Sequence, residues 1–365
     1  MSSQLGAVQS AASEKMDHNR MIEFLGRVAG DSAAALAGVS TSIGARLGLY
    51  QALRGAGPVV AAELARRTGL SPRYVTEWLD LQVASEYVVY DPSYHTYELP
   101  DEHAAVLADP ASPTYAVGSF LMLKSLYGTE DVLVDAFRDG TGVGWGDHEA
   151  ALFDGVATFF RPGYLASLVG DWLPALDGVV TKLEQGASVA DVGCGHGHST
   201  LVMARAFPES RFYGFDFHEP SVELARKHAA EAGLTQQVTF EVASAEQIPG
   251  GNYDLITYFD CLHDLGDPGR ALERAEQVLA EGGSCLVVEP NASPQPHKNI
   301  SPVGRAYSAT SVALCLPTAL AQNGPLALGN HAGEEVLRKL AADAGLRSWA
   351  LTAETATNRI YQVRR

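Results

Sequence analysis

VADVGCGHGHST, residues 189–200, joins a strand-like run to a helix-like run through a G-x-G-x-G segment, residues 193–197. Glycines tolerate tight backbone turns and allow a ligand to approach the main chain at the N-terminus of the following helix. A dinucleotide-binding fingerprint would place its third glycine at position 198, where this chain has His198. The segment therefore predicts an α/β fold with a cofactor loop of another kind, closely preceded by Asp191.

A second acidic residue stands at the spacing that a nucleoside ligand requires. Asp216 ends the next strand-like run, "RFYGFD". At this point of doubly wound folds a carboxylate accepts the hydrogens of the ribose hydroxyls. The glycine segment and Asp216 together predict a nucleoside-type cofactor. The D-x-G-x-G-x-G form that begins at Asp191 is characteristic of sites for S-adenosylmethionine.

Strand-like and helix-like runs alternate over residues 187–365, as in "ASVADVG", "HSTLVMARAFP", "RFYGFD" and "SVELARKHAAEAGL". Such alternation is typical of a mostly parallel sheet with helices on both faces. Residues 111–186 are mostly helical. A helical connector of this kind often lines a ligand cleft, so we expect Phe160 and Tyr164 in the substrate pocket, with Tyr307 from a later helix-like insertion.

Residues 21–110 carry the pattern of a winged helix. A short helix, a turn at Gly69 and a second helix opened by Ser71 and Pro72 precede two strands, "YVVYD" and "TYEL". Residues 46–103 contain five Arg and no Lys against eight Asp and Glu. Because neutralisation of phosphates dominates DNA affinity, this balance disfavours DNA binding and favours a dimerisation or lid module.

The whole-chain composition excludes several classes of protein. A net charge of −17 disfavours nucleic-acid partners, and no run approaches the roughly 18 apolar residues of a membrane span. Four cysteines without paired spacing argue against a disulfide framework or a zinc site. The polar residues 1–20 lack an apolar signal core and are expected to form a flexible tail. We therefore expect a cytoplasmic protein.

The chain after residue 20 resembles a known family. It is similar to the class I S-adenosylmethionine-dependent methyltransferases that carry an N-terminal winged helix, such as plant-type small-molecule O-methyltransferases. Stretches such as "EWLDLQVASEYVVYD" and "CLHDLGDP" make it more similar still to actinobacterial winged-helix methyltransferases. The resemblance implies a Rossmann-like domain with a seven-stranded, mostly parallel sheet, S-adenosylmethionine as cofactor and a small-molecule substrate. It also implies a homodimer built through the winged-helix domain.

Carried over position by position, the resemblance assigns the cofactor contacts. Asp191, Gly193 and Gly195 would hold the methionine moiety. Asp216 and Phe217 would hold the ribose and the edge of the adenine.

Two positions depart from the family pattern. Ser244, beside Ala245, replaces an aspartate that contacts the adenine amino group, and a serine hydroxyl could substitute for it. Phe259 replaces a lysine near the cofactor and removes a charge from the site.

The stretch "CLHDLGDP", residues 261–268, contains the expected acid–base group. His263 follows the carboxyl end of a strand, where open α/β sheets place ligands, and its ordinary pKa of ~6.5 suits proton removal near neutral pH. The resemblance implies that His263 is the general base and that Asp264 matches the neighbouring aspartate of the family motif. Glu289, which ends the neighbouring strand, would orient the histidine.

Alternatives remain at this stage. His263 could serve only for positioning, either in a loop before the helix that Asp267 and Pro268 begin or in methyl transfer to nitrogen or carbon. The chain could also be a cofactor-binding transcription regulator without catalysis. A metal site made of Asp260, His263 and Asp264 is disfavoured because this trio has no strong ligand spacing, so no metal is expected.

Overall fold

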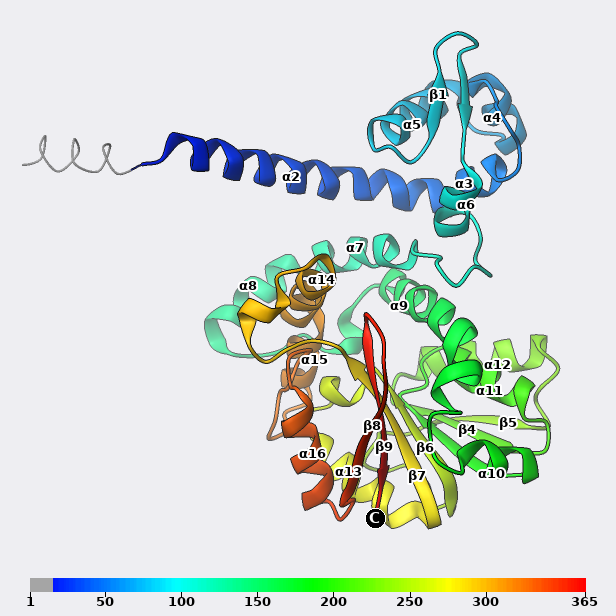
Figure 1. The fold of residues 1–365 in the computed structure, drawn as a ribbon, viewed down its shortest axis with the longest axis vertical. Coiled ribbons are helices and arrows are strands. Elements are labelled where there is room, and N and C mark those ends of the chain that lie inside the picture. The colour runs from blue at the N-terminus through cyan, green and yellow to red at the C-terminus, as the bar shows by residue number, and fades with distance from the viewer. Residues whose placement is uncertain (1–15) are drawn as a thin grey trace, which may run out of the picture. The chain divides into compact units, whose positions relative to one another are not determined.

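The computed structural model describes residues 16–365, so most of the expected tail lies outside the described residues. The chain divides into two compact units between Ala108 and Asp109 (Figure 1). Within the described residues the first helix starts inside the expected tail, at His18, because the Asp17 side chain accepts the backbone N–H of Asn19 at 3.0 Å and caps the helix.

The first unit is mainly helical. Its elements are α2 (His18–Arg46), α3 (Leu49–Leu53), α4 (Ala61–Thr68), α5 (Pro72–Ala84), β1 (Val89–Asp91), β2 (Thr96–Glu98) and α6 (Asp101–Leu107). Gly69 ends α4 in the left-handed conformation, which makes the turn into α5, and the β1–β2 hairpin forms the wing. Trp78 packs edge-on against Tyr50 at 4.9 Å and donates its indole N–H to the carbonyl of Ser40. These contacts join α5 to α2 and α3.

The second unit is built on a seven-stranded sheet of order β5-β4-β3-β6-β7-β9-β8. The strands are β3 (Ser188–Val192), β4 (Arg211–Asp216), β5 (Val238–Val242), β6 (Tyr253–Phe259), β7 (Leu279–Pro290), β8 (Ser348–Glu354) and β9 (Asn358–Arg364). Only β9 runs antiparallel to its neighbours, β7 and β8. The carboxyl ends of the parallel strands therefore share one edge, where ligands bind in open α/β sheets.

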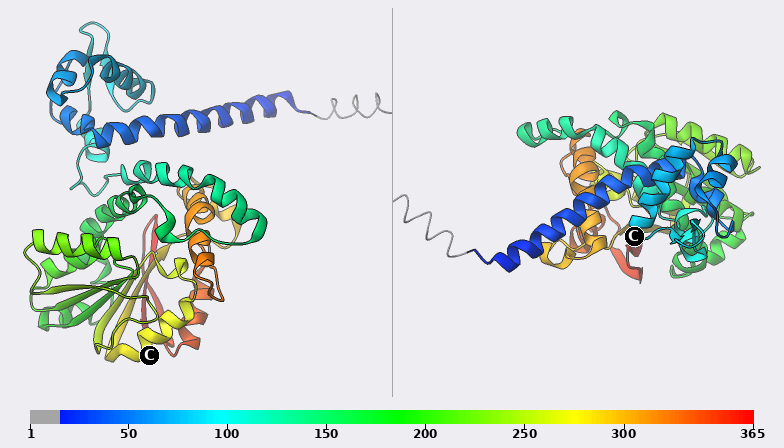
Figure 2. Two further views of the ribbon diagram at one scale, coloured as in Figure 1. Left: turned by 180° about the vertical axis from the view of Figure 1, so that it is seen from behind. Right: turned by 90° about the horizontal axis from the view of Figure 1, so that it is seen from above.

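Helices cover both faces of this sheet, as Figure 2 shows from behind. Residues of α10 (Val179–Gln185), α11 (His198–Ala206) and α12 (Glu219–Glu231) share one apolar core with the sheet, and residues of α13 (Pro268–Val278) and α16 (Glu334–Asp343) share another. Val189 belongs to the first core and Ala190 to the second, as the alternation of side chains along a strand requires. The predicted fold, a seven-stranded mostly parallel Rossmann-like sheet after a helical winged-helix domain, is confirmed.

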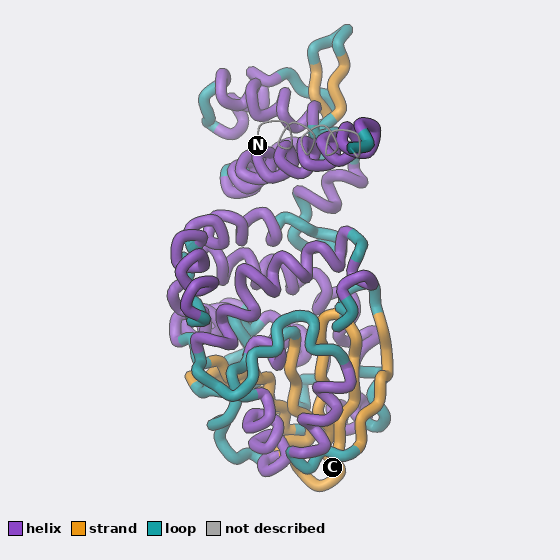
Figure 3. The backbone as a smooth tube through the Cα atoms, turned by 90° about the vertical axis from the view of Figure 1, so that its left-hand side faces the viewer, coloured by secondary structure: helices purple, strands orange, loops and turns teal. Residues whose placement is uncertain are grey.

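Further helices gather beyond one end of the strands (Figure 3). They are α7 (Gly118–Gly128), α8 (Glu130–Asp139), η1 (Trp145–Asp147), α9 (Ala150–Gly163), η2 (Tyr164–Trp172), η3 (Leu262–Asp264), η4 (Pro296–Asn299), α14 (Pro302–Thr310), η5 (Ser311–Cys315) and α15 (Leu316–Ala321). The connector helices, α7 to η2, belong to the same compact unit as the sheet. None of the described helices combines the length and the hydropathy that a membrane crossing needs.

Candidate functional site

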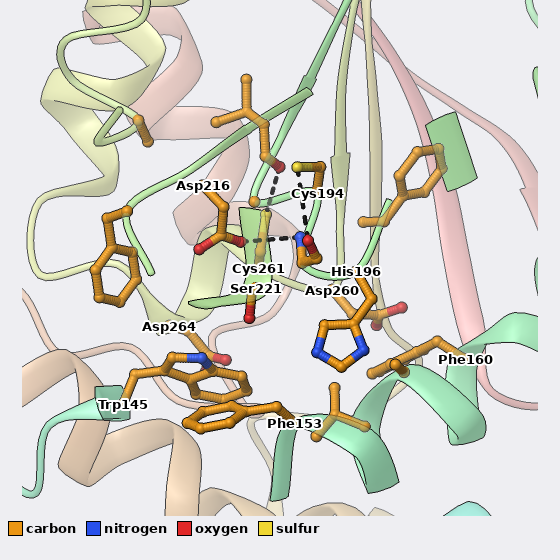
Figure 4. Close-up of a pocket in the computed structure, with 18 of the residues that line it drawn as sticks. Trp145, Phe153, Phe160, Cys194, His196, Asp216, Ser221, Asp260, Cys261 and Asp264 are labelled. Carbon is orange, nitrogen blue, oxygen red and sulfur yellow. Dashed lines mark hydrogen bonds between the residues drawn. The ribbon is translucent and has the colours of Figure 1, made fainter. Parts of the chain in front are cut away.

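A cavity opens at the carboxyl edge of the sheet, entirely within the second unit (Figure 4). The predicted residues that line it are Phe160, Tyr164, Gly193, Gly195, Asp216, Phe217, Ala245, Phe259 and Asp264. The predicted residues that do not line it are Asp191, Ser244, His263, Glu289 and Tyr307. The cavity lining therefore contains most of the predicted cofactor residues but not His263 or Glu289.

The glycine loop is held by backbone hydrogen bonds to the neighbouring strand. The N–H groups of Gly193 and Cys194 both donate to the carbonyl of Phe215, at 2.8 and 3.0 Å. Gly195 has a φ of +51°, and a Cβ built there would meet nothing within 4 Å. Because Gly195 lines the cavity, its missing side chain leaves room for a ligand directly against the main chain.

Asp216 fixes the loop and also faces the cavity. Its Oδ2 accepts the N–H of Gly195 and its Oδ1 accepts the N–H of His218, both at 2.9 Å. Burial raises the pKa of Asp216, and the two backbone hydrogen bonds oppose that rise. The carboxylate keeps further lone pairs for a ligand hydroxyl.

Asp191 is buried under the glycine loop and does not line the cavity. Its side chain is 1% exposed, and its oxygens accept the hydroxyls of Ser199 and Thr200, both at 2.6 Å, and of Thr257 at 2.9 Å. Burial raises its pKa, while the three hydroxyls act in the opposite direction. Asp191 therefore connects the start of α11 to β6 through hydrogen bonds. The sequence around Asp191 does not predict this structural role.

His263 lies between two carboxylates. Its Nδ1 is 2.6 Å from Oε2 of Glu289, and its Nε2 is 3.2 Å from Oδ1 of Asp264. Glu289 also accepts the N–H of Leu262 at 3.1 Å. Burial works against a charge on the ring, but Glu289 and Asp264 outweigh it and raise the pKa of His263 well above its usual value. The two carboxylates favour the imidazolium form of the ring, and Asp264 is the member of the three that lines the cavity.

The structure also brings Asp260 to the cavity, a residue that the sequence analysis considered only as a metal ligand. Its oxygens accept both hydrogen bonds from Nδ2 of Asn358, at 2.7 and 2.9 Å. Its φ of +48° is unusual for a residue with a side chain. Burial, followed by the charge of Glu289, raises its pKa well above the usual value. Its place directly after β6 is the signal that could have identified it.

Aromatic rings form much of the remaining wall. Tyr164 and Phe259 lie 5.3 Å apart, and Trp145 and Phe153 lie 5.5 Å apart. Trp145 and Phe153 were not predicted, because an aromatic residue near a glycine-rich loop has no distinctive spacing. Tyr307 donates its hydroxyl to the carbonyl of Thr357 at 2.5 Å and stays outside the lining.

A grouping of metal-ligand types occurs close by, among the described residues. Ligand atoms of His263, Asp264 and Cys315 lie within 4.8 Å of one another. Nδ1 of His263 is already bonded to Glu289, and the Cys315 thiol has its pKa raised to about 12 by burial, which opposes thiolate ligation. These two observations favour a hydrogen-bonded cluster over a cation site.

Comparisons with known proteins agree with this geometry. Residues 183–342 match the family described as methyltransferase domain, and residues 34–109 match the Rv2258c-like winged HTH domain. A ubiquinone biosynthesis O-methyltransferase of Xanthomonas euvesicatoria pv. vesicatoria (strain 85-10) is 28% identical over 191 residues, which is 51% of this chain and 72% of that protein.

Solved structures extend the likeness to both units. Human N-acetylserotonin methyltransferase in complex with S-adenosylmethionine has a TM-score of 0.69 at 18% identity and covers 96% of this chain and 99% of its own. A mitomycin 7-O-methyltransferase has a TM-score of 0.62 at 19% identity and covers 99% of both chains. Identities of this size show a shared fold, and the methyltransferase-domain match confirms the predicted enzyme class. The chain thus carries an Rv2258c-like winged helix-turn-helix domain followed by a methyltransferase domain.

Proposed function

We propose that this enzyme methylates an oxygen atom of a small molecule and that the chain Glu289–His263–Asp264 is its acid–base unit. The observation that carries this proposal is that Asp264 faces the same cavity as the glycine loop. When bound there, S-adenosylmethionine supplies an electrophilic methyl group on a sulfonium. The aromatic walls support a small organic acceptor over a macromolecule.

The residues present fit this cofactor. The carboxylate of Asp216 can accept the ribose hydroxyls while it holds the loop, and Phe217 and Ala245, which line the same cavity, can contact the adenine. The open space at Gly195 suits the methionine moiety. Ser244 and Asp191 support the site from behind its lining.

Side chains of the protein must remove the proton from the acceptor hydroxyl. A hydroxyl becomes a better nucleophile when a positioned group takes its proton, which typically contributes about 10²–10⁴ in rate. Asp264 is the member that can touch an acceptor hydroxyl, and Nε2 of His263 lies 3.2 Å from its Oδ1. Glu289 fixes the orientation of the ring and stabilises its charge.

An acceptor screen with labelled cofactor tests the proposal. We expect transfer to hydroxyl compounds, and a loss of at least about 100-fold in turnover for Asp264→Asn and His263→Gln with unchanged affinity for S-adenosylhomocysteine. The exposed Asp171→Asn serves as the control. Full turnover in both variants would leave His263 and Asp264 with structural roles only.

We also propose that the enzyme is a homodimer in the cytoplasm, joined through its winged-helix unit. Phe24, Leu25 and Leu36 of α2 are 64%, 64% and 76% exposed, and no residue from 18 to 30 is buried. So many apolar side chains on one exposed helix support a partner surface, and a second copy is the occupant that the family resemblance implies. The four cysteines are all free, which supports a reducing compartment.

Sedimentation equilibrium tests the dimer. The wild type should have twice the mass of the chain, and Leu25→Glu combined with Leu36→Glu should have the mass of one chain. Val89→Glu on the wing, a position already 54% exposed, should remain dimeric. A monomeric wild type rules the dimer out.

A further inference from the structure

Asp260 presents a fixed carboxylate to the cavity. A carboxylate has about four lone-pair sites, and Nδ2 of Asn358 occupies one on each oxygen, at 2.7 and 2.9 Å. The backbone of Asp260 is fixed as well, because its N–H donates to the carbonyl of Val288 at 2.8 Å while its φ stays at +48°. Asp260 lines the cavity, so its remaining acceptor capacity is available to a ligand there.

Within residues 16–365, the lining around Asp260 contains acidic residues and no basic residue with a fixed charge. The described residues that line the cavity include Asp216, Asp260 and Asp264 but neither Lys nor Arg (Figure 4). Its two histidines, His196 and His198, both have their pKa lowered, chiefly by burial, and stay neutral. A cavity of this kind repels an anionic acceptor and attracts a donor or a cation.

The walls beside Asp260 are aromatic. Phe160 and Tyr164 stack with ring centroids 6.3 Å apart, and Tyr164 lies 5.3 Å from Phe259. Ring faces pair with another aromatic ring or with an alkyl ammonium group. The wall and the carboxylate together favour an aromatic molecule with a hydrogen-bond donor at one end.

Asp264 provides a second carboxylate, so Asp260 is not needed for proton removal and can bind the acceptor instead. Oδ1 of Asp264 is buried and has no hydrogen-bond partner, although it lies 3.2 Å from Nε2 of His263. An acceptor hydroxyl can satisfy that oxygen during proton removal. Binding and proton removal can therefore be divided between Asp260 and Asp264.

We propose that Asp260 selects the acceptor: the substrate is a neutral or cationic aromatic molecule that donates a hydroxyl or ammonium hydrogen to Asp260, and carboxylates and phosphates are rejected. This inference rests on the proposed O-methyltransferase function and names its substrate class. Asp260 binds the acceptor, and Asn358 is a positioning residue that acts through Asp260.

A matched set of acceptors tests the inference. Catechol and naphthol scaffolds, each with an ethyl, an aminoethyl or a carboxyethyl substituent, differ only in remote charge. Calorimetry in the presence of S-adenosylhomocysteine gives their affinities, and labelled cofactor gives their turnover. We expect the ethyl and aminoethyl compounds to bind at least about tenfold more tightly than the carboxyethyl compound on the same scaffold.

Variants separate Asp260 from its neighbours. Asp260→Asn should reduce this discrimination at least about fivefold with cofactor affinity unchanged, and Asn358→Leu should do so partly, whereas the control Asp171→Asn should leave it intact. Equal or tighter binding of the carboxyethyl compounds overturns the inference, as does binding of none of the six. An unchanged ratio in Asp260→Asn, with or without a loss of cofactor affinity, also overturns it. If Asp260→Asn does not fold, the test rests on the wild-type ratio of affinities between the ethyl or aminoethyl compounds and the carboxyethyl compound.

The two proposals fail in different ways. Binding with S-adenosylhomocysteine reports acceptor charge whether or not a methyl group is transferred. Charge preference without transfer to oxygen contradicts only the proposed function, and transfer to oxygen without charge preference contradicts only the role of Asp260.

Discussion

Nδ1 of His263 lies 2.6 Å from Oε2 of Glu289, and each residue is only 3% exposed. Removing one partner of a buried pair leaves the other charge without compensation, which typically costs about 3–5 kcal/mol. Glu289→Gln keeps the shape of the side chain and should lower the free energy of unfolding at pH 6 by about 3 kcal/mol, measured by urea denaturation. Glu354→Gln, an exposed carboxylate paired with Arg359, should change it by less than about 0.5 kcal/mol.

The pH dependence of that difference follows from the raised pKa of His263. A raised pKa in the folded state gives stability that is complete below the unfolded value of ~6.5 and is lost as the pH rises toward the folded value. The gap between wild type and Glu289→Gln should therefore shrink above pH 6.5. A gap that widens from pH 6 to pH 9 contradicts the imidazolium assignment.

Asp216 should control affinity for the cofactor. Asp216→Ala removes the acceptor for ribose and also frees the N–H of Gly195. Hydrogen bonds to charged groups contribute about 1.5–3 kcal/mol, so we expect S-adenosylhomocysteine to bind about 10- to 100-fold more weakly in calorimetry. Glu219→Gln, an exposed carboxylate three residues later, is the control. Equal affinity in Asp216→Ala would refute the ribose assignment.

Two glycines of the loop should respond differently to alanine. A Cβ at Gly197 would lie 2.5 Å from Cζ of Phe240 at a φ of +77°, so Gly197→Ala should destabilise the fold by about 2–3 kcal/mol. Gly195→Ala adds its methyl group to open cavity space and should cost about 1 kcal/mol of stability but much of the cofactor affinity. Thermal unfolding and calorimetry on both variants check this order, and the reverse order would contradict it.

His198 should make the fold sensitive to acid. Burial, followed by the charge of His228, lowers the pKa of His198 to about 3. Between pH ~6.5 and ~3 the unfolded chain therefore holds a proton that the folded chain lacks, so acidification costs up to about 1.4 kcal/mol per pH unit. The loss of stability from pH 6.5 to 5.5 should be smaller in His198→Gln than in wild type by urea denaturation. The exposed His297→Gln should match wild type, and equal slopes in all three proteins would contradict the assignment.

Local signals in the sequence account for the parts of the site that were predicted. The glycine loop follows one strand and Asp216 ends the next. Because strands and helices alternate along the chain, these strands are expected to be parallel, and their carboxyl ends meet at one edge of the sheet. Winged helix, sheet and cofactor class follow from patterns of this kind. Glu289 was placed beside His263 because β6 and β7 are neighbours, and the structure joins the two residues.

Long-range partners account for what the sequence did not reveal. Asn358 is 98 residues from Asp260, and Thr257 is 66 residues from Asp191, so no local pattern connects them. The hydroxyls of Ser199, Thr200 and Thr257 all donate to Asp191, which does not line the cavity. Tyr307 was expected from a helix-like insertion, and its hydroxyl donates to Thr357, 50 residues away and just before the final strand.

The position of β9 has a consequence for folding. β9 follows β8 in sequence but lies between β7 and β8, so the sheet cannot close before this strand arrives. Contacts of large sequence separation form slowly because loop closure precedes them. Asn358 begins β9, and its two bonds to Asp260 belong to this closing event. The hydrogen bonds that hold the glycine loop do not involve β9, whereas those that hold the carboxylate of Asp260 do. Binding of the methyl donor can therefore become possible earlier in folding than selection of the acceptor.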